Sequence, residues 1–110
     1  MINWARIKDL RLEIGDDDFF EVLAMFLEET DDVIARLLDH PDLTDVEGLL
    51  HFLKGSALNL GLTDFAEICQ NGEKSTAAGA AGSVDLHKLA AVYTHSKTSL
   101  LAKLGRPEMA

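Results

Sequence analysis

A histidine, a lysine and a glycine fall on one face of a predicted helix within the stretch HFLKGSALNLG, residues 51–61. His51, Lys54 and Gly55 stand at i, i+3 and i+4, so they stack along a strip about one helical turn long. An imidazole can act as a nucleophile, and an ammonium group one turn away can balance an anion that is added to it. Glycine within a helix costs about 1 kcal/mol relative to alanine. Its presence here indicates a need for bare backbone beside the imidazole.

The other side of this helix is predicted to be buried. Apolar residues at helical spacing form a seam of Leu50, Leu53, Ala57 and Leu60. Positions 47, 51, 54, 55 and 58 point away from that seam, so His51 is predicted to face solvent or a partner. Thr44 and Glu47 have the spacing of a capping box. We therefore expect Thr44 to be the N-cap and Gly61 to end the helix as its C′ residue.

Two helices are predicted before this one. The first is short, covers residues 3–14 and ends at Gly15. Three aspartates at 16–18 favour the start of the second, because carboxylates stabilise a helix N-terminus. Its long core-facing stripe, which Pro41 should terminate, consists of Phe19, Phe20, Leu23, Phe26, Leu27, Thr30, Val33, Ile34, Leu37 and Leu38.

Two further helices are predicted after it. Thr63 is the expected N-cap of the fourth helix, and Ser83, at the end of the small-residue linker 77–83, is the expected N-cap of the last. The buried positions are predicted to be Phe65, Ile68, Cys69 and Gly72 in the fourth helix and Leu86, Leu89, Ala90, Tyr93, Leu100 and Leu104 in the last.

Four substantial helices with short connections predict an all-α fold, an antiparallel up-down four-helix bundle with a short additional N-terminal helix. Residues 1–110 are expected to form a single domain, with its core over 16–104 and a flexible tail over 105–110.

Charge and composition exclude several function classes. The chain has 110 residues and a formal net charge of −9, with fourteen Asp/Glu against four Lys/Arg in residues 1–47. This acidity argues against nucleic-acid and anionic-membrane partners, because both require neutralisation of phosphates. The single cysteine, Cys69, excludes an internal disulfide and is typical of a buried hydrophobe in a reducing compartment. Without a signal peptide or a long apolar run, we expect a cytoplasmic protein.

Other kinds of chemistry have little support. His40, His51, His87 and His95 lack metal-ligand spacing with Cys69, so no metal site is expected. The sequence has no phosphate-binding glycine motif and no nucleophile elbow. We expect no enzyme that acts alone on a small molecule.

The stretch HFLKGSALNLGL resembles the H-x-L-K-G-[SA]-[SA]-x-x-[LVI]-G signature of histidine-containing phosphotransfer (HPt) domains, the relay modules of multistep two-component signalling. An acidic segment, GDDDFFEVLAMFLEE, precedes it at the usual distance, and LTDFAEIC follows it as in the family. The resemblance covers roughly residues 5–104.

The resemblance implies a role for each residue of the strip. His51 would accept a phosphoryl group on Nε2, and Lys54 would stabilise that group electrostatically. Gly55 would allow close docking of a receiver domain, and Ser56 matches a small hydroxyl position that assists orientation. The group would pass in both directions between His51 and aspartates of receiver domains in hybrid histidine kinases and response regulators. Mg²⁺ would come from the receiver, so the chain, an expected monomer, would need no cofactor and would have no ATP-dependent kinase activity.

Two positions depart from the common pattern. Many family members have a glutamine that hydrogen-bonds the imidazole, and the corresponding residue here is Glu73. Its carboxylate would accept from Nδ1–H and hold the Nε2 lone pair outward; the alternative is an ordinary exposed glutamate. Gly72 replaces a larger apolar residue, from which we expect the fourth helix to fray toward the linker.

The receiver-docking surface is expected over the second and third helices. Val22 and Met25 lie beside the core stripe, and Leu58 lies one turn beyond Lys54. Apolar residues around a reactive histidine suit a transient interface, although they could simply flank the core.

Two other functions stay open at this stage. One is a helical adaptor that binds receiver domains or other signalling proteins without being phosphorylated. The other is the dimerisation domain of a histidine kinase, which a four-helix set within one chain disfavours.

Overall fold

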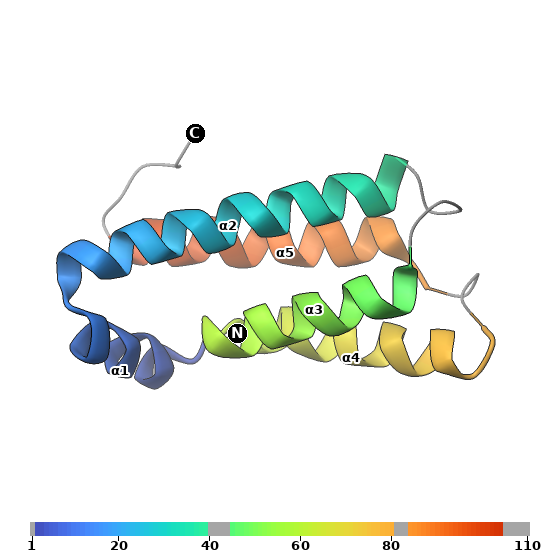
Figure 1. Ribbon diagram of the computed structural model, residues 1–110, viewed down its shortest axis with the longest axis horizontal. Coiled ribbons are helices and arrows are strands. Elements are labelled where there is room, and N and C mark those ends of the chain that lie inside the picture. Colours follow the sequence, from blue (N-terminus) through green and yellow to red (C-terminus); the bar gives the residue numbers. More distant parts are fainter. Residues whose placement is uncertain (1, 40–44, 81–83, 105–110) are drawn as a thin grey trace.

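The computed structural model describes residues 2–39, 45–80 and 84–104, and these ranges contain five helices. They are α1 (Trp4–Ile14), α2 (Asp16–Asp39), α3 (Val46–Asn59), α4 (Thr63–Ala77) and α5 (Leu86–Lys103). From α2 to α5 the helices run alternately in opposite directions, with α2 beside α5, α3 beside α4, and α1 across one end (Figure 1). The predicted all-α bundle with a short N-terminal helix is confirmed.

The bundle core is built from the predicted stripes. In α2 the buried residues are Phe19, Leu23, Leu27, Thr30, Val33, Ile34 and Leu37, and Phe20, Phe26 and Leu38 pack against them partly buried. The seam of α3 is at most 2% exposed at any of its four positions. Because one side of α3 is fixed in the core in this way, its other side must face outward.

A buried tyrosine ties α5 to α2. The Tyr93 hydroxyl donates to the Asp31 carboxylate at 2.7 Å, and Lys97 donates to the other oxygen of that carboxylate at 2.9 Å. Burial, with the Asp31 hydrogen bond and charge, raises the pKa of Tyr93, which keeps its hydroxyl protonated as a donor.

Helix α1 is fastened to the turn between α3 and α4. The Asn3 amide donates to the Gly61 carbonyl at 2.7 Å, and Arg6 Nε donates to the Asn59 carbonyl at 3.1 Å. Gly61 has a φ of +71°, and a Cβ there would lie 2.7 Å from the Asn3 carbonyl oxygen. Glycine is therefore needed at the predicted end of α3 for two reasons, the left-handed backbone and the close approach of α1.

The predicted caps of α3 and α5 are wrong. The N-caps are Asp45 and Asp85, each of which accepts a hydrogen bond from the amide three residues later. Thr44 and Ser83, like Pro41, lie outside the described residues. In both cases an aspartate lies closer to the helix than the predicted hydroxyl residue does. Its charged carboxylate is a stronger acceptor than a hydroxyl group.

The expected cap of α4 is also wrong. Thr63 is the first residue of the helix, and Leu62 occupies the N-cap position without a side-chain cap hydrogen bond. Leu62 is 1% exposed, so its burial in the core sets where the chain enters α4.

The predicted fraying of α4 at Gly72 does not occur. Gly72 is buried, and the helix continues to Ala77. A Cβ at this position would lie 2.9 Å from Leu50 Cδ1 and 3.3 Å from Val84 Cγ1. Glycine is present because α3 and the chain entering α5 approach α4 too closely for a side chain.

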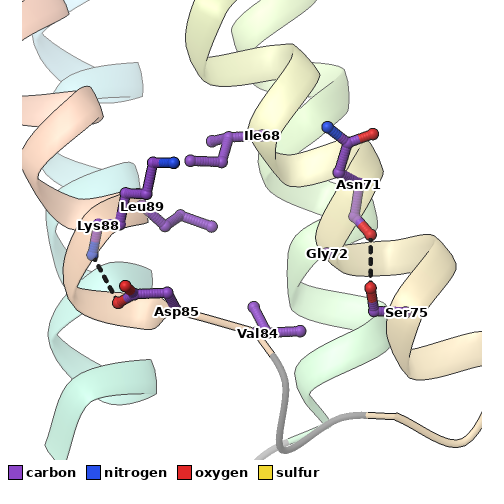
Figure 2. Close-up of a pocket in the computed structure, with 8 residues that line it drawn as sticks. All are labelled: Ile68, Asn71, Gly72, Ser75, Val84, Asp85, Lys88 and Leu89. Carbon is purple, nitrogen blue, oxygen red and sulfur yellow. Dashed lines mark hydrogen bonds between the residues drawn. The ribbon is translucent and has the colours of Figure 1, made fainter.

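The hollow beside Gly72 is lined by α4 and the start of α5 (Figure 2). Two of its polar groups are already used inside the fold, because Ser75 Oγ donates to the Asn71 carbonyl at 3.1 Å and Asp85 accepts from the Lys88 amide at 3.0 Å. These bonds close a helical turn and cap a helix, so we assign this region a structural role.

Candidate functional site

Helix α3 presents His51 to solvent, and α4 holds it from behind. The His51 side chain is 69% exposed, although Leu50 and Leu53 on the same helix are completely buried. His51 Nδ1 lies 2.7 Å from Glu73 Oε1 and 3.3 Å from Oε2. The contact predicted between Glu73 and His51 is therefore present in the fold.

The hydrogen bond determines which ring nitrogen is available. An ionised carboxylate only accepts, so the Nδ1 atom must carry the proton that is donated to Glu73. In the neutral ring the lone pair then belongs to Nε2, on the side of the imidazole away from Glu73. The site thus presents an oriented nitrogen lone pair at an open surface.

Lys54 binds the same carboxylate. Its ammonium nitrogen lies 3.1 Å from Glu73 Oε2. The carboxylate of Glu73 therefore accepts from the His51 imidazole and from the Lys54 ammonium group, which lie on successive turns of α3. The His51 hydrogen bond, and after it the Lys54 hydrogen bond, hold the pKa of Glu73 below its ordinary value. Glu73 therefore stays ionised near neutral pH and keeps the ammonium group of Lys54 one turn from the imidazole.

Gly55 leaves the surface next to His51 bare. A Cβ built at this position would meet no heavy atom within 4 Å. The interior of the molecule gives no reason for a glycine here, since an alanine would fit and would favour the helix. Packing within the described part of the chain therefore does not account for this glycine.

Ser56 does not belong to this cluster. It is only 6% exposed, and a position five residues after His51 is rotated by about 140° around a helix. The side chain of Ser56 lies on the core side of α3, and a role for its hydroxyl in orientation stays a prediction.

The apolar residues expected to surround the site differ in exposure. Met25 is 68% exposed and Leu58 is 56% exposed, whereas Val22 is half-buried. The structure adds Phe52, a neighbour of His51 in the sequence that is 37% exposed. The sequence could have indicated this exposure, because Phe52 does not belong to the apolar seam of α3. An aromatic residue outside that seam has no predicted packing partner within the fold.

Cys69 is not a second nucleophile. It is fully buried in α4, and burial, with a smaller effect of the Glu73 charge, raises the pKa of its thiol to about 12. The thiolate is therefore scarce at neutral pH.

Two kinds of site are not found within the described ranges. No group of three or more His, Cys, Asp or Glu side chains there is arranged to hold a metal ion. In the same residues no helix combines the length and apolar character that a membrane span needs.

The fold and the site define a class of protein, a helical bundle with an exposed histidine whose Nδ1 is held by an acidic residue of the next helix. The model of the Hpt domain family matches residues 21–91, more than half of the chain. The chain belongs to the Hpt domain family.

Several phosphorelay proteins are similar to the chain. The multistep phosphorelay regulator 1 of Schizosaccharomyces pombe is 38% identical over 69 residues, which cover 56% of this chain and 23% of the relative. The phosphorelay intermediate protein YPD1 of Saccharomyces cerevisiae is 30% identical over 76 residues, and that of Candida albicans is 32% identical over 75. Those two alignments cover 64% of this chain and 46% and 41% of the relatives. The chain thus spans less than half the length of each relative, and no solved structure matches it significantly.

Proposed function

We propose that this chain is a phosphorelay intermediate that accepts and donates a phosphoryl group on His51. The observation that supports this most strongly is the His51–Glu73 hydrogen bond of 2.7 Å, which leaves Nε2 as the outward nucleophile. The Nε2 lone pair attacks the phosphorus of an aspartyl phosphate, an N–P bond forms, and the P–O bond to the aspartate breaks with its electron pair leaving on the carboxylate. The reverse steps deliver the group to the aspartate of another receiver domain.

Charge balance explains the roles of Glu73 and Lys54 in this proposal. The proton on Nδ1 stays in place during attack, so the phosphorylated ring becomes positively charged. Glu73, 2.7 Å from Nδ1, offsets that charge, and Lys54 is close enough along α3 to approach the phosphoryl oxygens. Phosphoryl transfer depends largely on positioning and electrostatics. A single oriented histidine with these two neighbours therefore meets the needs of the acceptor.

The partners in this proposal are receiver domains of hybrid histidine kinases and response regulators. They would dock over Met25, Leu58 and the bare backbone at Gly55 and would supply the Mg²⁺ ion. The chain would act as a cytoplasmic monomer without ATP-dependent kinase activity of its own. The acidic net charge of −9 supports a protein partner over a nucleic acid.

The test is transfer from receiver domains that have been charged with a radioactive small-molecule phosphodonor. The full chain should acquire a label that survives alkali and is lost in acid, as expected for phosphohistidine, and the His51→Gln protein should acquire none. The glutamine amide can still donate to Glu73, so this variant removes the nucleophile while keeping the contact between α3 and α4.

Circular dichroism of the His51→Gln protein provides the folding control. Label that persists in a folded His51→Gln protein would reject His51 as the acceptor. If neither protein is labelled by any receiver but both bind receivers equally, the chain is an adaptor that is not phosphorylated.

A further inference from the structure

An exposed groove lies between α1 and the end of α5. It has a volume of about 390 Å³, and its apolar wall includes Trp4, Leu12 and Leu104. Trp4 is 37% exposed and Leu12 is 74% exposed. Large apolar side chains in an open groove are typical of a protein-binding surface.

The charge of this groove is opposite to that of the molecule. Among the described residues that line it, three are cationic, Lys8, Arg11 and Lys103, and one is acidic, Asp16, although the chain has a net charge of −9. Arg11 is held in place, because its Nε donates to Asp16 at 3.1 Å and its guanidinium lies over the Phe19 and Phe20 rings.

The two lysines of the groove are free to bind a partner. Neither Lys8 nor Lys103 forms an ion pair with a carboxylate of the described residues. Two ammonium groups that have no ion-pair partner in this part of the chain, beside an exposed indole, can attract a partner with carboxylates and a large apolar side chain.

The groove is separate from the histidine site. His51 and Lys54 come from α3 and Glu73 comes from α4, whereas the groove is formed by α1, the first residue of α2 and the end of α5. The described residues that line it all lie outside residues 21–91, the part of the chain that matches the family model. The groove therefore lies outside the segment that matches the family model. It can bind a partner that leaves the face around His51 open.

We propose that this groove binds an acidic peptide segment of another protein that inserts a large apolar side chain beside Trp4. Charge complementarity selects this occupant over a basic or neutral segment. A second copy of this chain would bring its whole net charge of −9 against that of the first copy, whereas a short segment brings only the few carboxylates that face the groove.

The experiment uses a phage-displayed library of random dodecapeptides, selected on the full chain and depleted on the Lys8→Glu/Lys103→Glu protein. The peptide that is most enriched, synthesised without tryptophan, is titrated against the chain. Because Trp4 is the one tryptophan of the sequence, its fluorescence reports on the groove alone. We expect selected peptides to be rich in Asp and Glu with a large apolar residue, and Trp4 emission to shift to shorter wavelength on binding.

Two charge variants give the matched comparison. Lys8→Glu/Lys103→Glu should weaken binding about tenfold or more, whereas Lys88→Glu, on an exposed residue at the start of α5, should change it less than about twofold. Circular dichroism checks that the variants fold, and labelling of His51 by receivers should be unchanged in the double variant.

Several results would overturn the proposal. They are the absence of enriched peptides, enrichment of neutral or basic ones, or binding that leaves Trp4 emission unchanged. A shift of Trp4 emission with protein concentration alone would assign the groove to self-association, and a shift only with phosphatidylglycerol vesicles would assign it to a lipid surface.

Discussion

Gly55 and Gly72 stand inside neighbouring helices, and each should cost its helix about 1 kcal/mol relative to alanine. Their surroundings are opposite. A Cβ at Gly72 would press against Leu50 and Val84, whereas a Cβ at Gly55 would meet nothing within 4 Å. The first glycine is explained by packing within the chain and the second is not.

This difference separates a fold requirement from a binding requirement. Gly72 lets α3 and the segment that enters α5 approach α4, so it belongs to the core that positions His51 and Glu73. Gly55 stands one turn from His51 on the exposed side of α3, and no described residue packs where its side chain would be. The proposed function would use this position, because a docking receiver domain could approach the bare backbone at Gly55.

The tight packing around Gly72 can be tested through Cys69, which lies on the buried side of the same helix. Its pKa of about 12 leaves little thiolate in the folded protein, whereas in the unfolded chain the thiol returns to its ordinary value. At about pH 8 we expect iodoacetamide to modify folded Cys69 at least about 1,000-fold more slowly than the urea-unfolded chain. Mass spectrometry measures both rates, and similar rates would show that this side of α4 is open.

Valine at the two glycines compares the two regions directly. Gly72→Val should lower the free energy of unfolding by about 2–3 kcal/mol, because the extra atoms overpack a site next to the fully buried Leu50. Gly55→Val should stay within about 0.5 kcal/mol of the parent, because its side chain enters open space. Urea unfolding measures both values, and equal losses would remove the distinction between the glycines.

Much of the fold could be predicted from the sequence because apolar periodicity reports burial directly. The stripes of α2 and α3 are in the core where spacing placed them, and Gly61 ends α3 as expected. The N-cap residues were harder to predict. Several polar residues lie near each helix start, and tertiary packing decides which of them takes the N-cap position. At α4 a buried leucine, Leu62, takes the N-cap position although Thr63 has the better side chain for it.

The candidate site was predictable in part. His51, Lys54 and Gly55 share a face because they share a helix, and Glu73 was placed by the resemblance to HPt domains. Ser56 was grouped with them by the motif alone, although its spacing of five residues from His51 already indicates another side of α3. The reason for Gly72 could not be predicted either, since it depends on contacts with two other segments, at Leu50 and Val84.

Alanine at Gly55 should separate stability from transfer. Gly55→Ala is expected to raise the free energy of unfolding by up to about 1 kcal/mol, as a helix former replaces glycine at an open position. It should slow transfer from a receiver domain about tenfold, because the added methyl group keeps the partner from the backbone beside His51. The rate is measured by mixing the chain with labelled receiver domains, quenching the reaction at successive times and counting the label on the chain. A more stable protein with an unchanged rate would assign Gly55 no part in docking.

The smallest effect is expected in the titration of Glu73, which links the buried side of α4 to the open face of α3. Its pKa is lowered from 4.5, first by the His51 hydrogen bond and then by that of Lys54. Because the folded pKa of Glu73 lies below its unfolded pKa, the stabilisation from Glu73 is complete above the unfolded pKa and is lost as pH falls through the folded value.

Carboxyl-carbon NMR should give a titration midpoint for Glu73 below 4.5. The midpoint should rise toward the ordinary value in His51→Ala and rise less in Lys54→Met, because His51 is the larger cause. A larger rise in Lys54→Met would show that the ammonium group, and not the imidazole, is the main partner of this carboxylate.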